Sequence, residues 1–276
     1  METWKRTVYI SLVCVFCTAF GVSQLAPILP LYFHDLGVQT PEAMSLWSGL
    51  ATGATYIIVC LAAPFWGRVA DKKGRKITLI RSSFGMALCN ILIAFQTTPE
   101  GVVLIRLVQG LVSGFYSASI TLIASESPIE RTGWALGLLA SANLAGSLIG
   151  PLLGGYIADT VGIRNDFIIV GTLMGLAGVL ATIFIHENYV PQPNPEKLSI
   201  RKLKEQIPEF NSIVALCVAS FIYAICIMSL QPVISVYIKG IVPSDTENLA
   251  FIAGAVFSAM GIAQLMSSSP LGKLVD

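Results

Sequence analysis

The sequence predicts an all-α membrane protein that crosses the bilayer several times. Hydrophobic residues make up 54% of the 276 residues and charged residues only 12%, and a soluble domain carries about twice that charged share. Apolar runs near twenty residues recur along the whole chain, each long enough to cross a hydrocarbon layer of about 30 Å as a helix. Because the runs are continuous and do not alternate, they indicate helices and not barrel strands.

The apolar runs divide the chain into spans joined by short polar segments. The first run follows Lys5 and Arg6 and continues without a small-residue cleavage site, so we expect an uncleaved helix and not a signal peptide. The expected spans cover residues 8–33, 46–66, 77–95, 101–124, 134–158, 166–185, 212–238 and 249–270.

The basic residues predict the orientation of these spans. With a cytoplasmic N-terminus, the outer segments hold only Arg164 and Lys239. The inner side then holds Lys5, Arg6, Arg68, Lys72, Lys73, Arg75, Lys76, Arg81, Arg131, Lys197, Arg201, Lys202, Lys204 and Lys273. Since cytoplasmic segments of membrane proteins carry an excess of Lys and Arg, this bias predicts that the N-terminus is cytoplasmic.

The longest polar segment, 186–211, separates the sixth span from the seventh. Asn194-Pro195-Glu196 is typical of a helix start. Apolar residues then recur at helical spacing opposite basic ones, which predicts a short amphipathic helix on the membrane surface. The alternative is a disordered linker.

Two parts of the chain resemble each other at one constant offset. Residues 26–33 (APILPLYF) align with 231–238 (QPVISVYI), and the stretch Gly67 to Asp71 aligns with Gly272 to Asp276. We therefore expect a six-helix bundle at 1–185, a linker at 186–211 and the start of a second bundle at 212–276. Since the second unit reaches only two helices, the chain is predicted to be truncated at its C-terminus.

The stretch 67–76 (GRVADKKGRK) lies between the second and third spans. It resembles the signature loop of the major facilitator superfamily, G-x-L-A-D-r-x-G-r-k, with Val69 in place of leucine. That resemblance implies the major facilitator fold and a conformation-dependent latch in which Asp71 takes part. A basic loop that only sets topology is the alternative. The candidate switch residues are Gly67, Asp71, Gly74, Arg75, Lys76, Gly272 and Asp276.

Span 101–124 contains the basic residue Arg106, whereas Arg81 lies in the first turns of span 77–95, on the side expected to be cytoplasmic. A charge at this depth is costly and almost always faces the bundle interior or a water-filled cavity. Polar or small residues follow it at helical spacing, so one face of this helix is predicted to line a cavity. Helix packing is the alternative. The residues are Gln109, Gly110, Ser113, Ser117 and Thr121, and RLVQG (106–110) resembles the family motif R-x-x-q-G, which implies a role of Arg106 in proton coupling.

Span 134–158 contains GSLIGPLLGG (146–155), which resembles the antiporter motif G-x-x-x-G-P-x-x-G-G. The resemblance implies a hinge in a drug:proton antiporter, and tight helix packing is the alternative. Pro151 removes a backbone hydrogen bond and favours a bend. The motif residues are Gly146, Gly150, Pro151, Gly154 and Gly155. Gln24 and Asn143 are predicted either to line the cavity or to bond a neighbouring helix.

A proton-coupled carrier needs a titratable group in its cavity. No acidic residue is expected in the middle of a span, so Asp35 and Glu126, at the ends of spans, are candidates by elimination. The alternative interpretation of Asp35 is that it is an ordinary acidic residue of a loop.

Together the motifs resemble bacterial multidrug exporters of the drug:proton antiporter family. The resemblance implies export of amphiphilic molecules in exchange for protons by a monomeric, multi-pass protein of the bacterial plasma membrane. Because one complete bundle and two further helices leave half of the cavity unwalled, residues 1–276 alone are expected to be inactive. The alternatives are a sugar or metabolite carrier of the same superfamily and a non-transporting fragment. No enzyme motif is found, the net charge of +1 indicates no nucleic-acid partner, and neither the cysteines nor His34 and His186 have the spacing of a metal site, so no cofactor or metal is expected.

Overall fold

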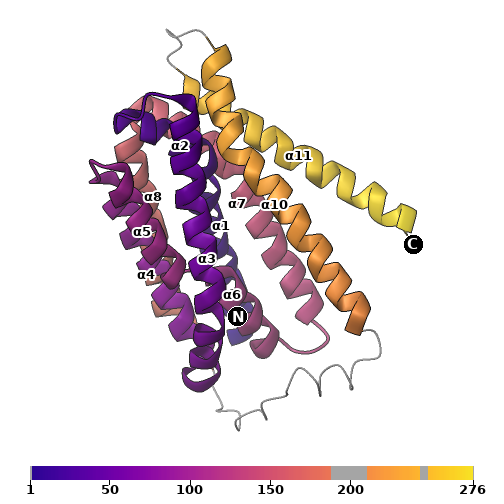
Figure 1. Ribbon diagram of the computed structural model, residues 1–276. Helices are drawn as coiled ribbons and strands as arrows, with labels where there is room; N and C mark the ends of the chain where they lie inside the picture. The colour runs from indigo at the N-terminus through magenta and orange to yellow at the C-terminus, as the bar shows by residue number, and fades with distance from the viewer. Residues whose placement is uncertain (1, 188–209, 243–247, 276) are drawn as a thin grey trace.

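The computed structural model describes residues 2–187, 210–242 and 248–275, and all regular structure in these ranges is α-helical (Figure 1). The predicted all-α fold is therefore confirmed. The amphipathic helix expected within 186–211 falls almost wholly outside the described residues, as does Asp276. The helices are α1 (Thr3–Ser23), α2 (Leu25–Asp35), α3 (Pro41–Lys73), α4 (Arg75–Ala94), α5 (Pro99–Val112), α6 (Phe115–Glu126), α7 (Thr132–Val161), α8 (Ile163–Phe184), α10 (Phe210–Ile241) and α11 (Leu249–Val275).

Seven described helical segments are long and apolar enough to cross a membrane, with α5 and α6 counted as one segment, Pro99–Glu126. A shorter apolar helix, Leu249–Ala263, lies in α11. Thr40 and Thr98 start two of the spans, because each hydroxyl accepts a hydrogen bond from a first-turn N–H and each precedes a proline.

Two predicted spans are broken in the structure. The first divides at Gln24 into α1 and α2, where Pro27 has no N–H to donate to the carbonyl of Ser23. The fourth divides between Val112 and Phe115, where Gly114 has φ +114°, a left-handed conformation that favours glycine. Both expectations of one continuous helix were wrong at these points.

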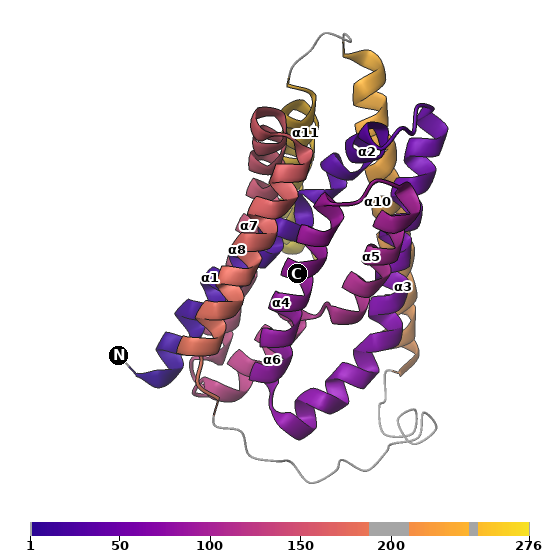
Figure 2. The ribbon, with the colours of Figure 1, turned by 90° about the vertical axis from the view of Figure 1, so that its left-hand side faces the viewer.

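The helices form one bundle with α10 and α11 on its side (Figure 1). Helix α1 packs on α7 and α8, α4 packs on α8 and α5, α11 packs on α7, and α10 packs on α2 and α3. The start of α1, the α3–α4 junction and the α6–α7 junction lie together at one end of the bundle, here called the basic end, while α2 and the α4–α5 and α7–α8 junctions lie at the opposite end (Figure 2).

Candidate functional site: the α7 glycines, a cavity and buried polar groups

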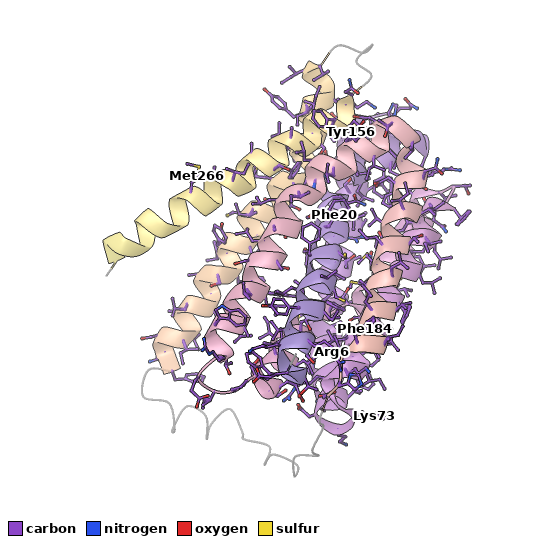
Figure 3. The ribbon with its side chains drawn as sticks, turned by 180° about the vertical axis from the view of Figure 1, so that it is seen from behind. Arg6, Phe20, Lys73, Tyr156, Phe184 and Met266 are labelled. Atoms are coloured by element: carbon purple, nitrogen blue, oxygen red, sulfur yellow. The ribbon has the colours of Figure 1, made fainter. Side chains whose placement is uncertain are left out.

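The motif glycines of α7 on one face are in close contact with α1. A Cβ added at Gly146 would lie 2.6 Å from the carbonyl oxygen of Phe16, and one at Gly150 would lie 2.6 Å from that of Phe20. At Gly154 an added Cβ would lie 2.6 Å from Cβ of Gln24. Phe20 is labelled at this contact in Figure 3. Because atoms this close leave no room for a side chain, the three glycines let the two helix backbones approach.

The adjoining face of α7 is equally close to α11. An added Cβ at Gly155 would lie 2.7 Å from the carbonyl carbon of Ala250 and 2.9 Å from Cα of Phe251. From the other side, a Cβ at Gly254 would lie 2.7 Å from the carbonyl carbon of Pro151. The motif therefore places α7 between α1 and α11, two helices far apart in the sequence.

A carboxylate of α7 holds the start of α11. Asp159 Oδ1 accepts a hydrogen bond from the N–H of Ala250 (3.1 Å) and Oδ2 accepts one from the N–H of Phe251 (2.7 Å). A negative charge at a helix N-terminus stabilises it by about 0.3–1 kcal/mol. Asp159 was not among the residues singled out from the sequence, because the N–H groups that it accepts from lie 91 and 92 residues later in the chain.

The signature loop is held by a residue from outside it. Helix α3 ends at Lys73, Gly74 has φ +91°, and α4 begins at Arg75. The carboxylate of Glu187 accepts hydrogen bonds from the N–H groups of Arg75 (2.7 Å) and Lys76 (2.8 Å). Glu187 thus caps α4, and no pattern in the sequence pointed to it.

Replacing Gly74 with alanine is expected to destabilise this loop. An added Cβ would lie 2.6 Å from Glu187 Oε2, and the backbone conformation itself is strained for any residue but glycine, at a cost of about 1–3 kcal/mol. We expect a lower unfolding midpoint in detergent for Gly74→Ala. Gly67→Ala is the matched control, because nothing lies within 4 Å of a Cβ added there. Equal midpoints for the two variants would contradict this loop geometry.

A cavity of about 340 Å³ lies between α3, α4, α5 and α6 toward the basic end. Asp71 and Arg75 of the signature loop line it, and so do Gly110, Ser113, Ser117 and Thr121 of the predicted polar stripe. Asp71 is exposed, as is Gly67, which also lines the cavity. The structure thus brings the signature loop and most of the polar stripe to one hollow. Gly272 falls within α11 and is not among the residues that line this cavity, which lie between Val59 and Thr121 in the sequence.

Arg81 and Trp66 hold the break between α5 and α6 beside this cavity. Arg81 donates hydrogen bonds to the carbonyls of Leu111 (3.0 Å) and Ser113 (2.9 Å), and the indole Nε1 of Trp66 donates to Leu111 (2.8 Å). The guanidinium lies 3.5 Å from the centre of the Trp66 ring, in a cation–π contact. These donors satisfy carbonyls at the end of α5 that have no helical partner. From its position in the sequence, Arg81 is expected only to contribute to the orientation of the spans.

Arg106 is buried and faces its own helix neighbour. Its side chain is 6% exposed, and Nη1 donates a hydrogen bond to Gln109 Oε1 at 2.6 Å. The Nε atom has no hydrogen-bond partner among the described residues. Neither Lys5–Glu2 nor His34–Asp35, the ion pairs described in the structure, includes Arg106.

The other candidates lie apart from one another. Asp35 is exposed, and it lines a second cavity of about 250 Å³ at the opposite end with His34, Asp159 and Lys239. Glu126 ends α6 at the basic end and is partly buried. Asn143 is partly buried on α7.

A buried acid that was not among the candidate residues, Asp166, lies at the start of α8. This residue is fully buried in the first turn of α8, where Gln24 Nε2 donates a hydrogen bond to its Oδ2 at 3.1 Å. The sequence placed Asp166 at the very start of a span and therefore next to water. Gln24 is fully buried in the same contact.

The chain matches the family model of the Major Facilitator Superfamily over residues 11–276. Among curated proteins, it is 36% identical to "Multidrug resistance protein MdtG" of Proteus mirabilis over 275 residues, which cover 100% of this chain and 68% of that protein. It is 37% identical over 273 residues to the protein of the same name from Dickeya zeae, covering 99% of this chain and 67% of that one. The chain thus spans about two thirds of the length of these relatives.

Solved structures share the fold at low sequence identity. The human organic anion transporter MFSD10 (TETRAN) aligns with a TM-score of 0.65 at 16% identity, covering 95% of this chain and 72% of that one. A D-xylose-proton symporter aligns with a TM-score of 0.62 at 14% identity, covering 95% of this chain and 66% of that one.

Proposed function

Because the chain belongs to the major facilitator superfamily of membrane transporters, we propose that it exports amphiphilic small molecules in exchange for protons by alternating access. The names of its relatives, multidrug resistance proteins, support the substrate class. The observation that carries the proposal is the position of α7, whose motif glycines contact α1 on one face and α11 on the other.

Alternating access requires two bundles that rock against each other around a central site. In our proposal residues 1–185 form the first bundle, 186–211 the linker and 212–276 the start of the second. The contact between α7 and α11 would then be one that opens and closes. The basic end would face the cytoplasm of a bacterial cell, with the N-terminus inside, and the protein would work as a monomer.

The cavity residues support an amphiphilic substrate. The hollow is lined by Trp66, small apolar residues, hydroxyls and the charged groups Asp71, Arg75 and Arg81. Arg106 supports the proton-coupled part of the proposal, because a buried cation in the part of the chain that the structure describes stands without a carboxylate partner. Such a cation would favour the charged form of any carboxyl that approaches it.

Ethidium transport tests this function. The full-length protein here means a chain that contains both complete bundles of our proposal. In everted membrane vesicles that contain it, we expect ethidium to accumulate when a proton gradient is imposed and to leave when the gradient is collapsed. A protein of residues 1–276 alone is expected to give no net accumulation, since two helices of a second bundle leave the central site unwalled. Ethidium accumulation that is the same with and without a proton gradient would contradict proton exchange. Accumulation by residues 1–276 alone would contradict the requirement for two bundles.

A further inference from the structure

A buried amide–carboxyl pair joins the break in the first span to α8. Asp166 and Gln24 are both fully buried, and a single hydrogen bond of 3.1 Å joins Gln24 Nε2 to Asp166 Oδ2. The two remaining oxygens, Asp166 Oδ1 and Gln24 Oε1, have no hydrogen-bond partner among the described residues. Both of these atoms are acceptors, so a donor is missing from the pair.

Gln24 lies at the break between α1 and α2 and packs against α7. The break between α1 and α2 puts it at the cap of both helices, where the backbone hydrogen bonds from Gln24 to Phe20 and from Ile28 to Gln24 are each long, at 3.4 Å. Gly154 of α7 is in close contact with its side chain, as described above. The pair therefore connects three spans: the broken first helix, α7 and α8.

The titratable groups of the helices packed against the pair make hydrogen bonds elsewhere or are thiols. On α8 itself, Arg164 donates to the carbonyl of Gln96 (3.4 Å), and on α7 Asp159 accepts from the start of α11. Tyr32 of α2 donates to the carbonyl of Ile93 (2.8 Å). The last titratable residues along α1 and along α4 are Cys17 and Cys89, whose thiols are both buried. Among the described residues no ion pair includes Asp166.

We propose that Asp166 and Gln24 form a proton-binding site. A proton on Asp166 Oδ1 would donate to Gln24 Oε1 while Gln24 Nε2 donates to Oδ2, so one proton provides a partner for both unpaired oxygens. The terminal torsions of Asp and Gln side chains are broad, and they allow the two oxygens to face each other. Without the proton, both oxygens stay unpaired and the carboxylate stays buried without a cation, which is costly because burial removes the hydration of the charge.

This site rests on the proton-coupled export proposed above and names the group that carries the proton. It also lies close to the packing that α7 makes with α11. Gly154 contacts Gln24 and the next residue, Gly155, contacts Ala250. Gaining or losing the proton changes the contact on one face of α7, and the contact with α11 lies on the adjoining face. Asp166 thus replaces Asp35 and Glu126 as the proton carrier of our proposal.

Asp166→Asn tests the site because the amide imitates the protonated acid. The Asn side chain has a donor for Gln24 Oε1 and an acceptor for Gln24 Nε2, so the variant is expected to fold and to unfold at the same midpoint as the unchanged protein. We expect purified full-length protein to release a proton when ethidium is added, and Asp166→Asn to release none. The carboxyl band in pH-difference infrared spectra is expected to be missing from the same variant. Glu100→Gln is the matched control, since Glu100 is exposed in the first turn of α5.

The outcomes separate this site from the proposed function. Equal proton release by Asp166→Asn and the unchanged protein would overturn the site and leave proton coupling in place, as would loss of release in Asp35→Asn or Glu126→Gln instead. No proton release from the unchanged protein at any pH would overturn proton coupling and this site together.

Discussion

Export by the full-length protein is expected to fall sharply when Gly155 is replaced by valine. The added Cβ would meet the backbone of Ala250 and Phe251, atoms that cannot rotate away as a side chain tip can. Overpacking of this kind costs about 1–3 kcal/mol. If the substitution destabilises only the conformation in which α7 and α11 are in contact, this cost shifts the ratio of that conformation to the open one by about 5- to 150-fold. If transport passes through the state with α7 and α11 in contact, export falls by a comparable factor.

Ethidium efflux from cells, normalised to the amount of protein in the membrane, measures this effect. Gly137→Val is the matched control: it places the same side chain on the same helix, at a position where an added Cβ meets nothing within 4 Å. We expect Gly137→Val to export like the unchanged protein. Equal efflux from the two variants would show that the α7–α11 contact is not part of the transport cycle.

Arg106→Ala is expected to abolish proton-driven export without harming the fold. A basic residue at the centre of a span costs about 2.5–3.5 kcal/mol of insertion free energy, and this one has only Gln109 as a side-chain partner among the described residues. Removing the cation should therefore leave the unfolding midpoint unchanged or raise it. The loss of export would then report function and not stability.

For Arg106→Ala, both the proton-driven export and the unfolding midpoint are measured. The same two measurements on Arg68→Ala serve as the control. Arg68 is exposed on α3, and we expect its removal to leave export nearly intact. Full export by Arg106→Ala at normal membrane levels would remove Arg106 from proton coupling. A lower midpoint that accompanies the loss would indicate a structural role instead.

Much of the fold follows from local properties of the sequence. Span positions could be predicted because a run of apolar residues must be helical in lipid wherever it packs. The threonine–proline starts at Thr40 and Thr98 are also local signals. Pro27 is a local signal for the break at Gln24. The break was not predicted because the sequence is apolar on both sides of it, which is typical of one continuous span. The break at Gly114 depends on Arg81 and Trp66, which come from other helices.

Motifs in the sequence single out candidate residues, but they do not reveal contacts that join distant segments. The glycines of α7 form a recognisable pattern, but which helices they contact is a property of the packed bundle. Glu187 and Asp159 each cap a helix that begins far from them in the sequence. Asp166 was missed because a residue that begins a span is exposed in most helices, whereas here Gln24 and the surrounding helices bury it.

Proton movement driven by a drug gradient tests the exchange most directly. Liposomes containing the full-length protein would be loaded with ethidium and a pH-sensitive dye, then diluted into ethidium-free buffer at equal pH. Proton-coupled export predicts that the interior becomes acidic as ethidium leaves, and that liposomes without protein show no such change. Protein-dependent loss of ethidium with no change in internal pH would contradict it.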